Sequence, residues 1–466
     1  MTKLFISAVI ILFVSFTSFS QTNEKIPGNW SGKLDLPGTK LEIIFKISVD
    51  ENGKLNTKMD VPVQGAKDLP VSETNVSSDS LKLSVAMIMG KFSGRITSDS
   101  IIEGTWKQSG ATFPLILKKT GVVTEMKRPQ TPKAPFPYFS EEVEYINQKS
   151  GLKLAGTLTL PENAENCIAV VLISGSGAQD RDESIFGHKP FLVIADYLTR
   201  NGIAVLRVDD RGIGGSEGNI NSVTSESFAG DILAGIEFLK TKKEIDQNKI
   251  GLIGHSEGGL IAPMVANSSN NVAFVVLLAG PGVTGEQIIY RQVELLNRAA
   301  GLTEEQITQK LNIQKNIFEI LLNKKDTVNQ MEYLQKVFSN GTYETMNEDQ
   351  KKIIDANLNA LKTKWFRFFL TYDPFPALVK LKCPVLALNG SKDLQVPPAE
   401  NLAAIEKALK EGGNKNFKTM EMKNLNQLFQ TCKTGAVAEY AQIEETISPA
   451  VLEILRDWIK NLGIKN

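Results

Sequence analysis

The feature of the sequence that most constrains the fold is the stretch 249–262, in which a short apolar strand runs through G-x-S-x-G into a small-residue helix. In such a nucleophile elbow the central serine sits on a strained strand-to-helix turn. Its two flanking glycines are needed because side chains there would collide with the neighbouring strand and helix. Ser256 is therefore the candidate nucleophile.

The motif occurs twice, so its context has to decide between the two copies. Gly214–Gly218 satisfies the same pattern earlier in the chain, but it follows Asp209-Asp210-Arg211 and runs into a polar stretch with no immediate helix. The copy at Ser256 has an apolar strand before it and an apolar helix after it. We therefore expect Ser256 on a true elbow and Ser216 in a loop.

Short alternating apolar runs broken by turn residues extend from Gly28 to about Thr120, with no helical segment between them. Runs at this spacing predict a small antiparallel barrel or sandwich, here an all-β domain over residues 21–120. The region holds no histidine and no cysteine. Ligand or partner binding and a structural appendage are both open interpretations of this domain, and the second is favoured.

A segment with four prolines, residues 121–140, predicts a stiff, extended linker after this domain. Beyond it, over residues 141–466, near-continuous Val/Ile/Leu strands alternate with helical stretches. Strands of this kind are buried on both faces, so the pattern predicts a parallel α/β sheet, opened by an antiparallel pair of strands.

One interval, about 282–381, separates two successive core strands and is mostly helical in pattern. It predicts a helical cap over the carboxyl edge of the sheet, where ligands bind in open α/β folds. The interval includes the aromatic run Trp365–Tyr372. Packing in the core of the cap and direct contact with a ligand are both open for this run.

The first twenty residues predict a secretory signal peptide (residues 1–20), because Lys3 is their only charge, the apolar run Leu4–Val14 follows, and small residues precede Gln21. The apolar run is shorter than the roughly 20 residues that span a bilayer. We therefore expect no membrane span after cleavage, and a periplasmic or secreted protein. Lysine plus arginine equal aspartate plus glutamate at 52 each, which offers no electrostatic case for binding nucleic acid. A small neutral ligand fits that balance better.

Cysteines and histidines are few. Cys167, Cys383 and Cys432 are too few for a disulfide scaffold, and the only histidines are His188 and His255. Without a cluster of such residues we expect no zinc site, and no metal and no cofactor is predicted.

An activated serine needs a base that takes its proton and donors that stabilise the oxyanion of the transition state. The backbone N–H of Glu257, directly after the nucleophile, is the first expected oxyanion donor. The second is expected from the glycine-rich loop after the strand Ile168–Ile173, at Gly175, Ser176 or Gly177. An ordinary turn is the alternative interpretation of that loop.

From about Glu141 to its end, the chain resembles an α/β-hydrolase of the type found among secreted bacterial esterases and serine aminopeptidase-like proteins. The matching stretches are Ser174–Arg181, Arg207–Ser216, the elbow at Ser256 and Asn389–Pro397. The resemblance implies an α/β-hydrolase fold with a helical cap insertion. The N-terminal β domain is similar to one often fused ahead of such hydrolases.

The resemblance also implies where the rest of the catalytic triad should lie. The acid follows the strand Val385–Asn389 in this family, and Asp393 is in that place, where it would hold the histidine tautomer and stabilise the imidazolium. The family's histidine lies in a segment similar to L-N-H-L-F-Q, which here reads Leu425-Asn426-Gln427-Leu428-Phe429-Gln430. Gln427 thus occupies the histidine position, and an amide cannot accept a proton at physiological pH.

Neither histidine of the chain is expected to replace the missing base. His255 precedes the nucleophile on the elbow, so its side chain should point away from the serine hydroxyl, toward the interior or the oxyanion loop. His188 lies near the start of the first core helix and would lack Asp393 as an orienting partner.

Three hypotheses about function follow. The resemblance implies a serine hydrolase of carboxylic esters that works through a Ser256 acyl-enzyme and is impaired by Gln427. The first alternative is a catalytically inactive pseudo-hydrolase that binds a small ester, peptide or glycan ligand. The second is an exo-acting serine peptidase.

Overall fold

A computed structural model describes residues 26–463, apart from short gaps at 37–38, 51–53, 65, 78, 109–110, 121–126, 221–222, 323–326, 340 and 347. The predicted signal peptide and the first residues of the predicted linker lie outside the described residues. The described chain forms two compact units, one built mainly from the residues before Val123 and one that contains the chain beyond it.

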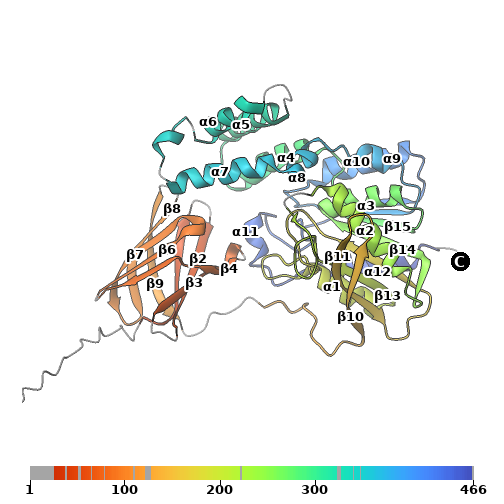
Figure 1. Ribbon diagram of the computed structural model, residues 1–466, viewed down its shortest axis with the longest axis horizontal. Helices are drawn as coiled ribbons and strands as arrows, with labels where there is room; N and C mark the ends of the chain where they lie inside the picture. The colour runs from red at the N-terminus through yellow and green to blue at the C-terminus, as the bar shows by residue number, and fades with distance from the viewer. Residues whose placement is uncertain are drawn as a thin grey trace, which may run out of the picture. The chain divides into compact units, whose positions relative to one another are not determined.

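The first unit is a single nine-stranded sheet with the strand order β4-β3-β2-β1-β9-β8-β7-β6-β5 (Figure 1). The strands of this sheet, with the two short 3-10 helices that lie between them in the chain, are β1 (Gly28–Leu36), β2 (Thr39–Val49), β3 (Leu55–Val61), η1 (Pro62–Gln64), β4 (Ala66–Pro70), β5 (Glu73–Val76), β6 (Ser80–Val85), η2 (Ala86–Ile88), β7 (Gly90–Ser98), β8 (Ile101–Gln108) and β9 (Ala111–Thr120). The pairings from β5 through β9 to β1 are antiparallel.

The sheet curls around an aromatic core. Phe45 on β2 and Phe92 on β7 have ring centroids 6.1 Å apart, although three strands separate β2 from β7 in the sheet order. Phe45 also lies 6.2 Å from Trp106 on β8. The small all-β domain expected from the alternating runs is confirmed as an antiparallel half-barrel, to which the structure adds the short strands β4 and β5 at its edges.

The second unit contains an eight-stranded sheet with the order β10-β11-β13-β12-β14-β15-β16-β17. The strands are β10 (Tyr138–Asn147), β11 (Leu152–Pro161), β12 (Cys167–Ile173), β13 (Ile203–Val208), β14 (Ile245–His255), β15 (Phe274–Leu278), β16 (Val385–Gly390) and β17 (Phe417–Met422). All pairs from β13 to β17 are parallel, whereas β10 and β11 form an antiparallel opening pair. Both features agree with the pattern of buried apolar strands.

Helices cover both faces of this sheet (Figure 1). Residues of α1 (Pro190–Arg200) and α12 (Pro449–Lys460) share one apolar core with the sheet, and residues of α2 (Ser225–Leu239), α3 (Glu257–Ser268) and α10 (Pro398–Glu411) share the other. The strands therefore contribute side chains to two cores, which is why they lack a polar face. A short helix, α11 (Val437–Tyr440), lies in the chain before α12.

A helical insertion separates β15 from β16. It consists of α4 (Gly285–Ala299), α5 (Glu304–Leu322), α6 (Thr327–Ser339), η4 (Tyr343–Thr345), α7 (Glu348–Lys362), α8 (Lys364–Thr371) and α9 (Phe375–Val379). The insertion has an apolar cluster of its own, which includes Phe318, Leu334, Leu358 and Leu370. The expected cap is thus confirmed as a separately packed layer of helices.

The described part of the proline-rich segment is held by carbonyl groups of the second unit. The Arg128 guanidinium donates to the backbone oxygens of Ile443 at 2.8 Å, Ala441 at 2.8 Å and Phe186 at 3.0 Å. Gln130 donates to the Ile447 oxygen at 2.7 Å. These contacts anchor the segment before β10 begins.

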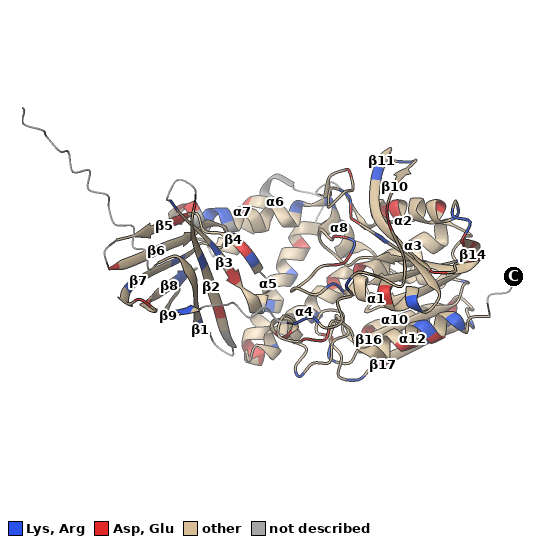
Figure 2. Cartoon of the chain, turned by 90° about the horizontal axis from the view of Figure 1, so that it is seen from below, with Lys and Arg blue, Asp and Glu red and all other residues tan. Residues whose placement is uncertain are grey.

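Charges of both signs are interspersed along the helices of the second unit (Figure 2). Within the described residues, no helix is long and apolar enough to cross a membrane. The same residues contain no group of three or more histidine, cysteine or carboxylate side chains that could hold a metal ion.

Candidate active site

Ser256 lies at a sharp turn between the last residue of β14 and the first residue of α3. Its φ of 51° and ψ of −118° are sparsely populated for a residue with a side chain, so the turn is strained. The backbone N–H of Ser256 donates to the Leu278 oxygen of β15 at 2.8 Å, and the Ser256 oxygen accepts from Gly259 at 2.9 Å. These bonds hold the serine at the carboxyl end of the central strand.

The two motif glycines are required by close backbone contacts. A Cβ atom on Gly254 would lie 2.1 Å from the Gly258 oxygen, and one on Gly258 would lie 2.1 Å from the Ile173 oxygen of β12. Neither contact leaves room for a side chain. The second copy of the motif differs, because Ser216 lies in a loop and its hydroxyl donates to the Asp209 oxygen at 2.8 Å.

The structure brings Ser256, Gln427 and Asp393 into one row. The Gln427 amide satisfies both neighbours when its nitrogen faces Asp393 and its oxygen faces Ser256. In that orientation Nε2 donates to both carboxylate oxygens of Asp393, at 2.7 Å for Oδ1, and Oε1 accepts from Ser256 Oγ at 3.0 Å. Gln427 and Asp393 are both buried. The amide therefore occupies the place between serine and acid that a triad histidine would take.

This row of hydrogen bonds lacks a proton acceptor next to the serine. The oxygen of an amide accepts a hydrogen bond but does not become protonated at ordinary pH, so Ser256 donates its hydrogen without losing it. Burial raises the pKa of Asp393 to about 7, against the lowering effect of the Val396 and Gln395 amides and of His255. Gln427, which is neutral, offers that carboxylate no opposite charge.

The loop predicted to supply oxyanion donors lies against the elbow. A Cβ atom on Gly175 would be 3.2 Å from Ser256 Cβ. The Gly175 N–H, however, donates to Glu183 Oε1 at 2.7 Å and so already has an acceptor in this structure. Glu257 begins α3, so its N–H has no acceptor within the helix. The oxyanion role stays a prediction for Glu257, Gly175, Ser176 and Gly177.

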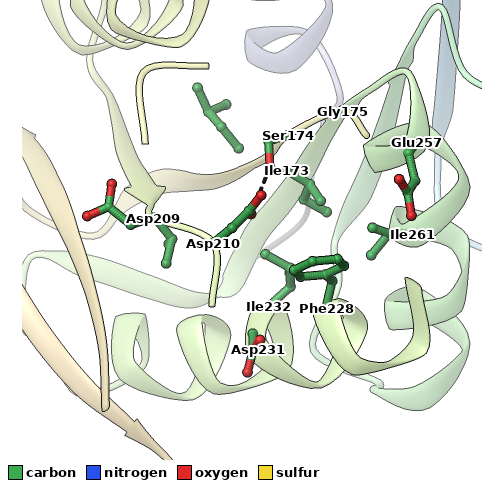
Figure 3. A pocket seen from close by; sticks show the side chains of 12 residues that line it. Ile173, Ser174, Gly175, Asp209, Asp210, Phe228, Asp231, Ile232, Glu257 and Ile261 are labelled. Carbon is green, nitrogen blue, oxygen red and sulfur yellow. Dashed lines mark hydrogen bonds between the residues drawn. The ribbon is translucent and has the colours of Figure 1, made fainter. Parts of the chain in front are cut away.

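A small cavity of about 30 Å³ borders this loop (Figure 3). Ser174, Asp210, Phe228, Glu257 and Ile261 are among its lining residues. The Ser174 hydroxyl and the Gln179 N–H each donate to the Asp210 carboxylate at 3.0 Å. Burial raises the pKa of Asp210 to about 7. Asp210 therefore fixes two points of the loop.

The two histidines have different surroundings. His255 Nδ1 lies 2.8 Å from Glu183 Oε1 and its Nε2 lies 3.0 Å from the backbone oxygen of Gln427. The His255 side chain thus points toward Glu183, which lies further along the same loop as the predicted oxyanion donors, as expected. His188 is fully buried, with Nδ1 at 2.9 Å from the Thr446 hydroxyl and Nε2 at 3.0 Å from the Tyr440 oxygen. Neither nitrogen of His188 faces Ser256.

One residue of the aromatic run connects the cap to the elbow. Trp365 on α8 donates its indole N–H to Glu257 Oε1 at 2.7 Å, and the Ser225 hydroxyl donates to the same oxygen at 2.6 Å. The Trp365 ring stacks on Phe369 at 5.5 Å. Burial raises the pKa of Glu257. The residue after the nucleophile is therefore hydrogen-bonded to the cap and to α2 together.

Comparison with known proteins identifies the family of this site. The family described as serine aminopeptidase, S33, matches residues 189–423, which is half of the chain, and the chain belongs to this family. The matched region contains Ser256 and Asp393 and ends before Gln427. The α/β-hydrolase resemblance drawn from the motifs is thereby confirmed.

Individual relatives are distant. Esterase EstD of Thermotoga maritima is 27% identical over 277 residues, 59% of this chain and 58% of that protein, so the chain matches less than two thirds of its length. An uncharacterized 31.7 kDa protein from the traX-finO intergenic region of Escherichia coli is 27% identical over 45% of this chain and 69% of that protein. Among solved structures, the Pyrococcus furiosus esterase PF2001 is 15% identical, with a TM-score of 0.44 over 73% of this chain and 98% of that chain.

The sequence did not indicate two residues of this site. Glu183 is not part of a recognisable motif, and it contacts His255, which lies 72 residues further along the chain. Trp365 stands in a run of several aromatic residues, and its contact with Glu257 spans 108 residues. The aromatic run gave a signal for the cap, but nothing in it distinguished Trp365 from its neighbours.

Replacing Asp393→Asn tests the raised pKa of the buried acid. The native pKa of about 7 lies above the value of about 3.9 for an unfolded aspartate. The stability that this group contributes is thus complete below the lower value and is lost as pH rises through the higher one. Thermal unfolding from about pH 5 to about pH 8 should show Asp393→Asn gaining stability relative to wild type. A difference that does not change with pH would contradict the raised pKa.

Replacing Trp365→Phe tests the bond between cap and elbow. A phenyl ring keeps the stacking on Phe369 but leaves Glu257 with Ser225 as its remaining side-chain donor, which should cost about 1.5–3 kcal/mol of unfolding free energy. Phe369→Leu is the control that removes the stacking and keeps the N–H. Unchanged stability in Trp365→Phe, measured by urea unfolding, would show that the indole N–H does not matter.

Proposed function

We propose that this protein is a serine hydrolase of carboxylic esters whose nucleophile, Ser256, lacks the histidine base of a complete triad. One observation carries the proposal, namely the Gln427 amide that hydrogen-bonds both Ser256 and Asp393. The elbow, the adjacent glycine-rich loop and the buried acid support acyl transfer as the reaction class. The ester substrate is inferred in part from the relative whose name is Esterase EstD.

Turnover through this site should be slow. Loss of the base alone lowers turnover on the order of 10⁶-fold in subtilisin, and about 10³ to 10⁴ over water remains from the oxyanion hole and binding. The parts that this protein retains are those responsible for the residual rate, namely the candidate oxyanion hole and the binding groups. We therefore expect Ser256 to form an acyl-enzyme slowly, because its proton has to leave without help from residue 427.

A second candidate function is binding without turnover. It is favoured by the same amide, because Gln427 satisfies both hydrogen-bonding neighbours and so keeps the row intact without a base. The ligand of such a pseudo-hydrolase would be a small ester, peptide or glycan fragment. An exo-acting serine peptidase, the activity that the family description names, is a third candidate that aminoacyl and dipeptidyl anilides would test.

The place of action is also part of the proposal. The charged start and the apolar run of the first twenty residues support export to the periplasm or beyond the cell. Amino-terminal sequencing of the protein secreted by its host would test cleavage before Gln21.

Replacing Gln427→His should restore the base and raise the hydrolysis of p-nitrophenyl acetate by about 10²–10⁴-fold. The same change should accelerate labelling of Ser256 by a fluorophosphonate, and Ser256→Ala should abolish both signals. The double variant Gln427→His with Asp393→Asn is the matched control, because a histidine at 427 needs the acid to orient it. It should lose most of the gain.

The outcomes separate the candidates. Rapid turnover by wild type, with no gain from Gln427→His, would mean that Ser256 has another base. If both proteins are inert although ligands bind, the pseudo-hydrolase is the better description.

A further inference from the structure

Glu183 and His255 form a buried pair of titratable groups that ester hydrolysis by Ser256 does not use directly. Their exposed fractions are 3% and 7%. His255 is the last residue of β14, directly before the nucleophile, and Glu183 lies in the loop between β12 and α1. Glu183 has a φ of 52°, so its backbone is held in the left-handed region without being glycine.

The hydrogen-bond partners of His255 determine its protonation. Nε2 faces the backbone oxygen of Gln427, which accepts only, so Nε2 carries a hydrogen. Nδ1 faces Glu183 Oε1, an oxygen that also accepts from the Gly175 N–H. An imidazolium, which carries a hydrogen on both ring nitrogens, can donate to both of these oxygens.

The charges around the ring favour this state. The groups that face it are Glu183, from the loop after β12, and Asp393, from the loop after β16, with Asp210 next to Glu183 and the Tyr440 phenol next to Asp393. Burial lowers the pKa of His255, but the Glu183 carboxylate, the Gln427 oxygen and Asp393 outweigh it and raise the pKa above its usual value. The imidazolium is also the cation that acts on the Asp393 carboxylate.

We propose that His255 is a positioning residue, which as an imidazolium joins the oxyanion loop, through Glu183, to the loop that carries residue 427, through its backbone oxygen. The effect on catalysis rests on the function proposed for Ser256. The hydrogen-bonded bridge from Glu183 through His255 to the Gln427 oxygen does not depend on that function. Glu183 Oε1, His255 and the Gln427 oxygen form one continuous chain of hydrogen bonds beneath the nucleophile.

The bridge addresses a problem of the fold. The oxyanion loop follows β12, the nucleophile follows β14 and residue 427 follows β17, so these parts come from separate strands. A misplacement of about 1 Å between such parts can cost about 100-fold in rate. Because the His255 ring contacts both loops and is covalently joined to Ser256, it fixes all three to one reference point.

His188 provides an internal comparison. Its Nδ1 lies 2.9 Å from the Thr446 hydroxyl, and its Nε2 lies 3.0 Å from the Tyr440 oxygen and 2.8 Å from the Gln430 amide nitrogen, so none of these partners is a carboxylate that would favour a charged ring. Burial lowers its pKa to about 4. The chain contains only these two histidines, so selective labelling reports on one expected cation and one expected neutral ring.

The protonation is tested by nitrogen NMR of the full chain with ¹⁵N-labelled histidine. At neutral pH, His255 should show two protonated ring nitrogens and His188 one. Glu183→Gln should turn His255 into a neutral ring and leave His188 unchanged, and Thr446→Val is the matched control that disturbs only His188. A neutral His255 in wild type would overturn the proposal, whatever the protein hydrolyses.

The positioning role is tested with isosteric variants in the Gln427→His background. His255→Asn keeps a donor near the Nδ1 position and loses the contact with residue 427, whereas His255→Gln keeps a donor near the Nε2 position and loses Glu183. Each should lower the turnover number about tenfold or more, with a smaller change in KM. Equal effects on kcat and KM, or none, would overturn the positioning role.

The pH dependence of stability supplies a readout that needs no turnover. Because the pKa of His255 is raised in the native state, its contribution is complete below the unfolded value of about 6.5 and is lost as pH rises through the native value. The loss of thermal stability in His255→Gln should therefore shrink at alkaline pH. A loss that is the same at all pH values would show that the ring acts only by filling space. If Gln427→His shows no turnover, the NMR and stability results still decide the bridge.

Discussion

The close backbone packing of the turn at Ser256 is the constraint on which the rest of the site depends. A side chain at Gly254 would collide with the Gly258 oxygen in the first turn of α3, and one at Gly258 would collide with the Ile173 oxygen of β12. Ser256, between these two glycines, has a strained φ of 51°. The backbone N–H of Ser256 also donates to the Leu278 oxygen of β15, so the position of the serine is fixed relative to the sheet.

Several buried carboxylates lie near the turn at Ser256, with few cations among them. Asp393, Glu183 and Glu257 are nearly inaccessible to water, and burial raises the pKa of two of them, Asp393 and Glu257. A neutral amide at 427 is compatible with this environment, because it donates to the acid and accepts from the serine without adding a charge. Gln427 thus occupies the position at which a triad histidine would accept the serine proton. Its amide stabilises the hydrogen-bonded row of Ser256, Gln427 and Asp393 but does not accept that proton. The imidazole of His255, the residue directly before Ser256, lies between the two loops, and its hydrogen bonds hold them together.

The cap takes part in the same arrangement. Glu257 supplies the backbone N–H after the nucleophile, and its carboxylate accepts from Trp365 on α8 and Ser225 on α2. A movement of α8 would therefore break a hydrogen bond to a buried carboxylate, which is costly unless water replaces it. The aromatic run packs within the cap, since Phe366 lies against its apolar cluster, and Trp365 reaches the elbow, while contact of the run with a ligand stays a prediction.

Much of the architecture was predictable because it rests on local patterns. Apolar runs buried on two faces indicate a parallel sheet, and the carboxyl ends of parallel strands meet at one edge. The family resemblance then implied that Asp393, after a later strand, lies near Ser256. Comparison with the family segment L-N-H-L-F-Q identified Gln427 as the residue that replaces the expected histidine. The strands β4 and β5 escaped prediction because they are short edge strands with little apolar alternation.

The amino-acid sequence by itself determined the parallel sheet, the glycine-flanked turn and the identity of the residue at 427, since each depends on neighbours along the chain. Only the tertiary structure decided what those residues touch. That Glu183 occupies the Gly175 amide, that His255 holds the oxygen of Gln427, and that Trp365 bonds Glu257 are contacts between residues far apart in sequence or on folded-back loops. Their distances follow from how strands, loops and cap pack together, and no periodicity or motif records that packing.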